Sequence, residues 1–95
     1  TGNGYKKTYV DANLQEANLN GFNLQEANLK WANLSNATLQ QANLKDANLR
    51  EVLAIGTDLT NAYLTGACLE AWNIDAKTKL SGVDCQYVFL LETPD

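Results

Sequence analysis

The chain has 95 residues, a formal net charge of -4 and no histidine, and this length suits a single domain. The acidic balance argues against a broad basic surface for phosphate backbones, so we expect no direct binding of nucleic acid. No apolar run approaches the roughly 20 residues that span a bilayer, and no leader of the signal-peptide type opens the sequence, so we expect a soluble chain without a membrane partner.

The first segment, residues 1–11, precedes a long regular repeat and is interpreted as an N-terminal cap. Extending the repeat backwards puts Lys7 and Tyr9 at positions that later hold Ala and Leu. We expect Tyr5, Tyr9 and Val10 to cover the open end of the repeat, because an exposed edge offers unpaired backbone groups.

Residues 12–51 repeat one five-residue pattern eight times without a gap. Six of the eight units open with Ala-Asn-Leu, and the other two open with Phe22-Asn23-Leu24 and Ala37-Thr38-Leu39. The two positions that follow each triplet hold mostly polar residues. An internal repeat of this regularity decides the fold before any other pattern.

A period of five residues excludes a long helix and a long strand. In a helix, leucines five apart advance roughly 140° each time and form no stripe. In a strand, an odd spacing sends successive leucines to opposite faces. Within one unit, however, Ala and Leu point the same way in a short extended piece, and the polar pair after them suits a corner. If every unit turns in the same sense, all leucines converge on one axis, which predicts a solenoid.

The repeated triplets resemble the pentapeptide-repeat family, whose motif is Ala, then Asp or Asn, then Leu, then two variable residues. The resemblance covers most of the chain. It implies an all-β fold, a right-handed quadrilateral β-helix with four pentapeptides in each coil. The square cross-section comes from the resemblance, because the period does not separate three-sided from four-sided coils.

Four units per coil would stack residues that are twenty apart. Phe22 would then lie beneath Ala42 and Ala62, where its ring is interpreted as core filling. The outward asparagines, which are Asn13, Asn18, Asn23, Asn28, Asn33, Asn43 and Asn48, would form amide ladders along the axis. We favour this structural role over a polar row that binds a ligand.

Trp31 occupies a corner position where other units carry polar or small residues. An exposed indole is a reasonable anchor for a protein partner. We favour packing of the ring on neighbouring side chains and keep the anchor as the alternative.

The segment Val52-Leu53-Ala54-Ile55-Gly56 disturbs the pattern, because Leu53 and Ile55 leave the inward positions and Ala54 occupies one. A local bulge that turns these side chains inward is the favoured interpretation. Otherwise two aliphatic residues stay on the surface and form a small apolar patch for a partner.

The pattern resumes at Thr57 and then slips by one residue at Lys77, which we interpret as a single corner insertion. The register after the slip is predicted to be Thr78-Lys79-Leu80, Val83-Asp84-Cys85 and Val88-Phe89-Leu90. Trp72 takes an inward position above Val52. The predicted organisation is a repeat solenoid over 12–76, a register-shifted degenerate final coil and C-terminal cap over 77–92, and a tail over 93–95. This amounts to about four coils, a rod on the order of 20 Å long.

The C-terminal run from Tyr87 to Leu91 is the most apolar stretch of the chain. It suits a terminal cap, which we favour, or a face for self-association. The stretch from Ala67-Cys68-Leu69 through Trp72-Asn73-Ile74 to Glu92 also resembles the closing part of cyanobacterial pentapeptide-repeat domains. Pro94 is expected to block further strand pairing in an exposed tail.

The two cysteines are predicted to lie on different sides of the chain, Cys68 outward and Cys85 inward, so we favour free thiols over a bridge. Free thiols fit a cytoplasmic location. Thr1-Gly2-Asn3-Gly4 reads as the start of a fragment, so the periplasm or the thylakoid lumen is the alternative if an upstream signal was removed. The sequence suggests no cofactor and no metal, because histidine is absent and the carboxylates show no ligand spacing.

These observations predict a non-enzymatic scaffold or protein-interaction module. The residues expected to meet a protein partner are Trp31, Leu53, Ile55, Tyr87 and Phe89, and the chain is expected to be a monomer or an end-to-end homodimer. The alternative, from family members that resemble duplex DNA in shape and charge, is an inhibitor of a type II topoisomerase. The modest net charge and the interrupting Lys30, Lys45 and Arg50 count against it.

Overall fold

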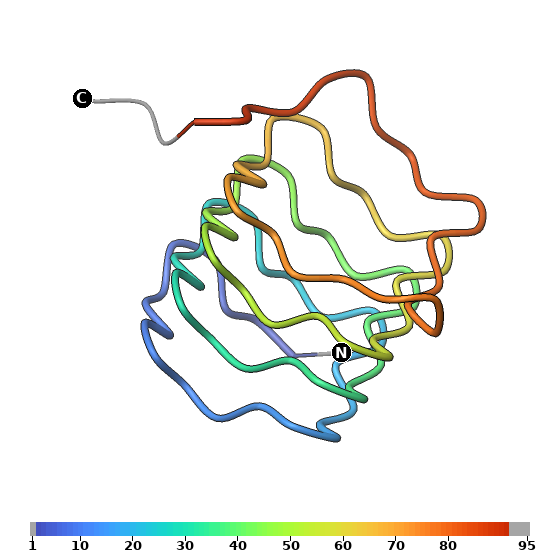
Figure 1. Ribbon diagram of the computed structural model, residues 1–95. Helices are drawn as coiled ribbons and strands as arrows, with labels where there is room; N and C mark the ends of the chain where they lie inside the picture. Colours follow the sequence, from blue (N-terminus) through green and yellow to red (C-terminus); the bar gives the residue numbers. More distant parts are fainter. Residues whose placement is uncertain (1, 92–95) are drawn as a thin grey trace.

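The backbone is a stack of coils that wind about one axis (Figure 1). A computed structural model describes residues 2–91, and over this range the chain has turns and isolated β-bridges but neither helices nor longer strands. The predicted tail, residues 93–95, lies outside the described residues. No helix within residues 2–91 is long and apolar enough to cross a membrane.

Parallel bridges between residues twenty apart hold the coils together, such as Asn13 with Asn33 and Asn18 with Thr38. On each side of a coil, the amide after the bridging residue donates to the next coil, as Leu14 N does to Asn33 O at 2.8 Å. Successive bridges along the chain are five residues apart, so each coil has four sides. The predicted solenoid of stacked twenty-residue coils is confirmed.

Each side ends in a tight turn made by the two variable residues of the unit. The turn closes with a bond from the next unit's first amide to the Leu carbonyl, for example Ala32 N to Leu29 O at 2.9 Å. The second variable residue has a positive φ, as at Glu16 (61°) and Asn36 (60°), which turns of type II require. A left-handed residue at the regular corners explains why these positions favour Asn, Asp and Gly.

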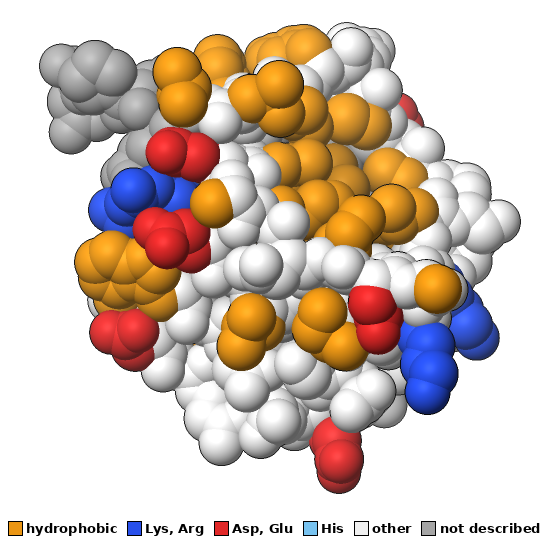
Figure 2. All heavy atoms as spheres, in the orientation of Figure 1, with side chains coloured by type: hydrophobic (Ala, Val, Ile, Leu, Met, Phe, Trp, Pro, Cys, Tyr) orange, Lys and Arg blue, Asp and Glu red, His pale blue; other side chains and the backbone are white. Residues whose placement is uncertain are grey.

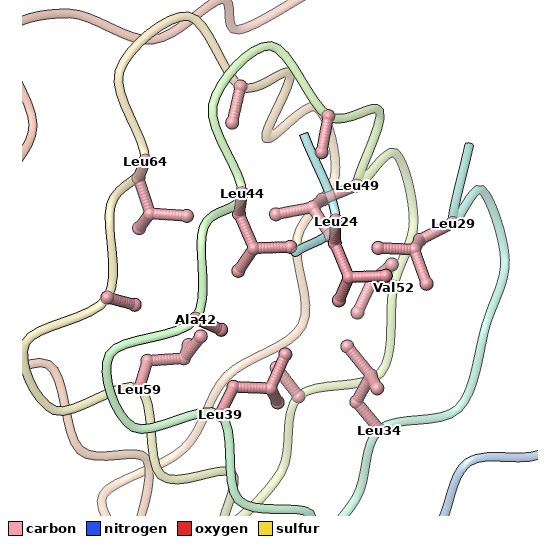
Figure 3. Packing of buried hydrophobic residues seen from close by; sticks show 14 of the residues in the cluster. Leu24, Leu29, Leu34, Leu39, Ala42, Leu44, Leu49, Val52, Leu59 and Leu64 are labelled. Atoms are coloured by element: carbon pink, nitrogen blue, oxygen red, sulfur yellow. The ribbon is translucent and has the colours of Figure 1, made fainter. Parts of the chain in front are cut away.

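The core is a column of Ala and Leu side chains that meet on the axis (Figure 3). Leu24, Leu34 and Leu44 are buried, and Leu14 packs against them from the first coil. The triplet therefore works as predicted: its first and third residues point inward and its middle residue points outward. Phe22 and Trp72 also pack against this cluster, so both inward predictions are confirmed.

The side-chain oxygens of the outward asparagines bond mainly within their own turns, which differs from the predicted amide ladders, although Thr38 Oγ1 donates to Asn18 Oδ1 in the neighbouring coil at 3.3 Å. In the bonds that the structure shows, the Asn13 side-chain oxygen accepts from the amide of Gln15 at 3.1 Å, and that of Asn33 accepts from Ser35 at 3.0 Å. The same local bond recurs at other units. An Asn side chain just before a turn reaches the amide two residues on more easily than a side chain in the next coil.

At the N-terminal end, the coil pattern continues into the segment that we interpreted as a cap. Asn3 bridges Asn23 and Thr8 bridges Asn28. Tyr9 packs against the core, whereas Tyr5 and Val10 are exposed. Of the three residues expected to cover this end, only Tyr9 therefore contacts the core.

The segment 52–56 contains no bulge, so the favoured prediction for it is wrong. Leu53 bridges Asn33 and Asn73 in the regular twenty-residue register, with Val52 and Ala54 buried on either side of it. Leu53 and Ile55 remain exposed. The reason is that the backbone hydrogen bonds of every side fix the alternation of side chains, and two aliphatic residues do not supply enough energy to change it.

The register slip at Lys77 is confirmed, because the bridge partners change from twenty to twenty-one residues apart. Asp58 pairs with Lys79, Tyr63 with Asp84 and Cys68 with Phe89. Asp75 organises the insertion: its carboxylate accepts from the amides of Gly56 and Lys77, both at 3.0 Å.

The two cysteines are free, and their burial is the reverse of the prediction. Cys68, at an outward position, is buried, and Cys85, at an inward position, is exposed. Cys85 belongs to the last described coil, where no further coil covers an inward side chain.

Candidate protein-interaction surface

The five residues expected to contact a partner are all exposed, but the fold does not bring them to one place. Trp31 lies at a corner, Leu53 and Ile55 lie in one unit of a middle coil, and Tyr87 and Phe89 lie in the last described coil. The Trp31 side chain makes contacts within the chain, whereas the two pairs present apolar surface.

Trp31 belongs to a corner where charged side chains of successive coils meet. Its indole Nε1 donates to Glu51 Oε2 at 3.1 Å, and the Lys30 ammonium lies 4.9 Å from the ring centre. Arg50 contacts Glu51 at 3.4 Å and Glu70 at 3.3 Å. Exposed pairs of this kind add little stability each, about 0 to 1 kcal/mol, but they hold the indole against its neighbours. The Trp31 ring must therefore give up its contacts with Glu51 and Lys30 before it can bind a protein partner.

Leu53 and Ile55 form a small apolar patch, which we call the Leu53 patch. Leu53 is 41% exposed. Its bridge partners on the same side are Asn33 and Asn73, so polar residues lie above and below it. An aliphatic pair at positions that hold polar residues in neighbouring coils has no role in the core, and its solvent exposure costs free energy.

The second apolar surface is the end of the solenoid, which we call the terminal face. Its exposed side chains are Ile74, Leu80, Tyr87, Phe89, Leu90 and Leu91. Figure 2 shows hydrophobic side chains gathered at the upper end of the molecule, where the C-terminal coil lies in Figure 1. The rings of Tyr87 and Phe89 pack edge to face, with centroids 5.8 Å apart.

Sequence reasoning missed the contribution of Ile74 and Leu80 to this face, whereas Leu90 belongs to the apolar run from Tyr87 to Leu91 that it singled out. Both missed residues occupy inward positions of their units, and the pattern alone assigns them to the core. The signal that could have found them is their place in the last coil, since an inward side chain is covered only when another coil follows.

The carboxylates of Asp58 and Asp75 accept hydrogen bonds from nearby groups of the same chain. Hydrogen bonds from the Thr60 side chain and from Gln40 Nε2, which lies 2.7 Å away, lower the pKa of Asp58 below its ordinary value of 3.8. The Gly56 amide, followed by the amide of Lys77, lowers the pKa of Asp75. Over residues 2–91, no group of three or more Cys, Asp or Glu side chains is placed to hold a metal ion.

The shift at Asp58 predicts a loss of stability in acid. A carboxyl whose pKa is lower in the folded state stabilises the fold fully above its unfolded pKa of about 3.9, and loses this contribution as the pH falls through the folded value. We expect the advantage of the wild type over Asp58→Asn, measured by urea unfolding, to shrink between about pH 5 and about pH 3. A difference that is constant over this range would contradict the assignment.

Comparisons with known proteins agree with this fold. The model of pentapeptide repeats matches residues 12–51 and 42–71, with 8 copies. A pentapeptide repeat protein, Rfr23, from the cyanobacterium Cyanothece 51142 is 31% identical with a TM-score of 0.78, over 87% of this chain and 56% of that chain. A pentapeptide repeat protein from the Arabidopsis thaliana thylakoid lumen is 25% identical with a TM-score of 0.57, over 86% of this chain and 57% of that chain.

The chain thus spans little more than half the length of these two solved relatives. No curated protein matches its sequence. Because the repeat matches over residues 12–71 and the fold is shared with a solved cyanobacterial protein, this chain belongs to the pentapeptide-repeat family.

Proposed function

We propose that the chain is a non-enzymatic protein-interaction module that binds a polypeptide partner through the Leu53 patch and the terminal face. The observation that carries this proposal is the exposure of Leu53 and Ile55, at positions whose stacked neighbours in the adjacent coils are polar. Neither Leu53 nor Ile55 contributes to the core, so their apolar side chains fit contact with another protein best. Trp31 is a weaker candidate, because Glu51 and Lys30 already engage its ring.

The architecture that we propose for this role is a right-handed quadrilateral β-helix of about four coils. Family membership supports the handedness, and the four-sided coil follows from the bridge spacing. The sides of this solenoid are held by backbone hydrogen bonds between coils, which lowers the entropy cost of binding. The proposed location is the cytoplasm, with the periplasm or the thylakoid lumen as the alternative.

The terminal face also suits a second copy of the chain, in an end-to-end homodimer. The alternative function is the inhibition of a type II topoisomerase, and the structure offers it little support. Glu51 and Glu70 both contact Arg50, so these acids do not present an uninterrupted negative stripe.

The test is a set of serine substitutions read out by binding and by mass. Leu53→Ser/Ile55→Ser removes the Leu53 patch, Tyr87→Ser/Phe89→Ser alters the terminal face, and Gln15→Ser is a control at an exposed turn. Light scattering after gel filtration reports a homodimer, and quantitative capture from an extract of the source organism reports other partners.

We expect the Leu53 patch variant to lose at least about tenfold in the captured amount of a specific protein, as the loss of a buried contact residue does, while Gln15→Ser retains it. A homodimer that only the terminal-face variant disrupts would assign that face to self-association. If no captured protein depends on either surface, and the chain is a monomer at all concentrations, the proposal is wrong.

A further inference from the structure

We propose that residues 77–91 form a terminal coil that opens as a unit while the preceding coils stay folded, and that Asp75 is the latch that keeps it closed. This inference goes beyond the proposed binding role, because it concerns the motion of one end of the solenoid. Its basis is the arrangement of hydrogen bonds at the insertion, the poor coverage of the terminal coil, and the residues that lie beneath it.

The latch is a single carboxylate oxygen at the start of the terminal coil. Asp75 Oδ1 accepts from the amides of Gly56 at 3.0 Å, Lys77 at 3.0 Å and Thr78 at 3.2 Å. Gly56 belongs to the coil below, and the other two amides lie on the inserted corner. The Thr78 hydroxyl adds a second tie, since it donates to the Ala54 carbonyl at 2.6 Å. The side chains of Asp75 and Thr78 thus fasten the inserted corner to the body of the solenoid, and Asp75 accepts most of the bonds.

The terminal coil is weakly packed compared with the coils before it. Its inward Leu80 and Leu90 are exposed, whereas Leu59 and Leu64 in the preceding coil are buried. In a solenoid each coil is stabilised by its neighbours, and within residues 2–91 the coil formed by 77–91 pairs with one neighbour, the coil that precedes it. Segments with few buried apolar contacts open at a lower free energy than the whole domain.

Backbone hydrogen bonds in both directions join the terminal coil to the coil that precedes it; the amides of Lys79, Asp84 and Phe89 donate to Thr57 O, Ala62 O and Ala67 O. On three sides the amides of Leu59, Leu64 and Leu69 donate to Lys79 O, Asp84 O and Phe89 O at 2.8, 2.9 and 2.8 Å. The thiol of Cys68 also lies in this layer, and Cys68 is buried although it occupies an outward position next to its bridge partner Phe89. Opening of residues 77–91 would release these three amides together and uncover that thiol.

Amide hydrogen exchange tests whether the coil opens as a unit. The outer set is Leu59, Leu64 and Leu69, and the matched inner set is Leu34, Leu39 and Leu44, whose amides donate to Leu53 O, Asp58 O and Tyr63 O. We expect the outer set to exchange with one common opening constant, at least about tenfold larger than that of the inner set. Equal protection of the two sets would overturn the proposal.

Substitutions at position 75 test the latch, with Cys68 as the reporter in a Cys85→Ser background. Asp75→Ala removes the acceptor, and hydrogen bonds to a charged group are strong enough that we expect Cys68 to react with a thiol reagent about tenfold faster or more. Asp75→Asn keeps an oxygen in place and should restore most of the slow rate. Gln15→Ala, at the same turn position of an earlier coil, should leave the rate unchanged.

The inner amides separate a local effect from general unfolding. In Asp75→Ala we expect the outer set to exchange faster, while the inner set changes by less than about twofold. If both sets accelerate by the same factor, the terminal coil does not open separately and the proposal is wrong. If neither Cys68 reactivity nor the outer set responds, Asp75 is not the latch.

Discussion

Replacing Leu44 by alanine is expected to destabilise the protein by about 2 to 5 kcal/mol, the largest effect that we predict for a single substitution. Leu44 is fully buried at the centre of the column (Figure 3). Its removal creates a cavity that Ala42 and Leu64 cannot fill, because the backbone hydrogen bonds of each coil fix the positions of their inward side chains. The cost is therefore expected in the upper part of the range.

Thermal or urea unfolding measures this loss, with Leu90→Ala as the matched control. Leu90 occupies the same position of its unit but is 72% exposed, so its truncation should cost less than about 0.5 kcal/mol. A domain of this size shifts its Tm by about 4 to 8 °C for each kcal/mol. A similar loss of unfolding free energy for both substitutions would show that another molecule covers the terminal face in solution.

Replacing Gly66 by valine is expected to destabilise the protein by about 2 to 3 kcal/mol, the second largest effect, because a β-branched residue at positive φ is strongly disfavoured. Gly66 has a φ of +79° at its corner. A Cβ atom on this residue would come within 2.0 Å of Asp46 Oδ1 in the coil below. Two separate costs, the backbone conformation and the clash, therefore add at one position.

A double-mutant cycle separates these two costs. Gly66→Ala should be less harmful in an Asp46→Ala background than in the wild type, since the clashing oxygen is then absent and only the conformational cost of about 1 kcal/mol remains. The free energies of unfolding come from urea titration of the four proteins. Strict additivity would mean that the Asp46 side chain moves aside without cost, so that φ alone sets the cost of replacing glycine at this corner.

Much of the fold could be predicted from the period of the repeat. The inward placement of Leu24, Leu34 and Leu44 follows from the alternation of side chains within a triplet, and that alternation is a local property. The slip at Lys77 was predictable for the same reason, because inserting one residue shifts every later triplet by one. The bonds of the asparagine oxygens within their own turns could not be predicted, because the choice between a bond within the turn and a bond between coils depends on geometry that the period does not specify.

The sequence by itself determined the solenoid and the alternation of its inward and outward residues, because a five-residue period leaves no other way to bury the leucines; the twenty-residue register came from the family resemblance and is shown by the bridges. Only the tertiary structure decided which inward residues are covered and which outward residues are not: Leu80 and Leu90 are exposed, and Cys68 is buried. The physical reason is that burial in a solenoid depends on the neighbouring coil. A triplet fixes the direction of a side chain, but only the coil stacked on it removes that side chain from water.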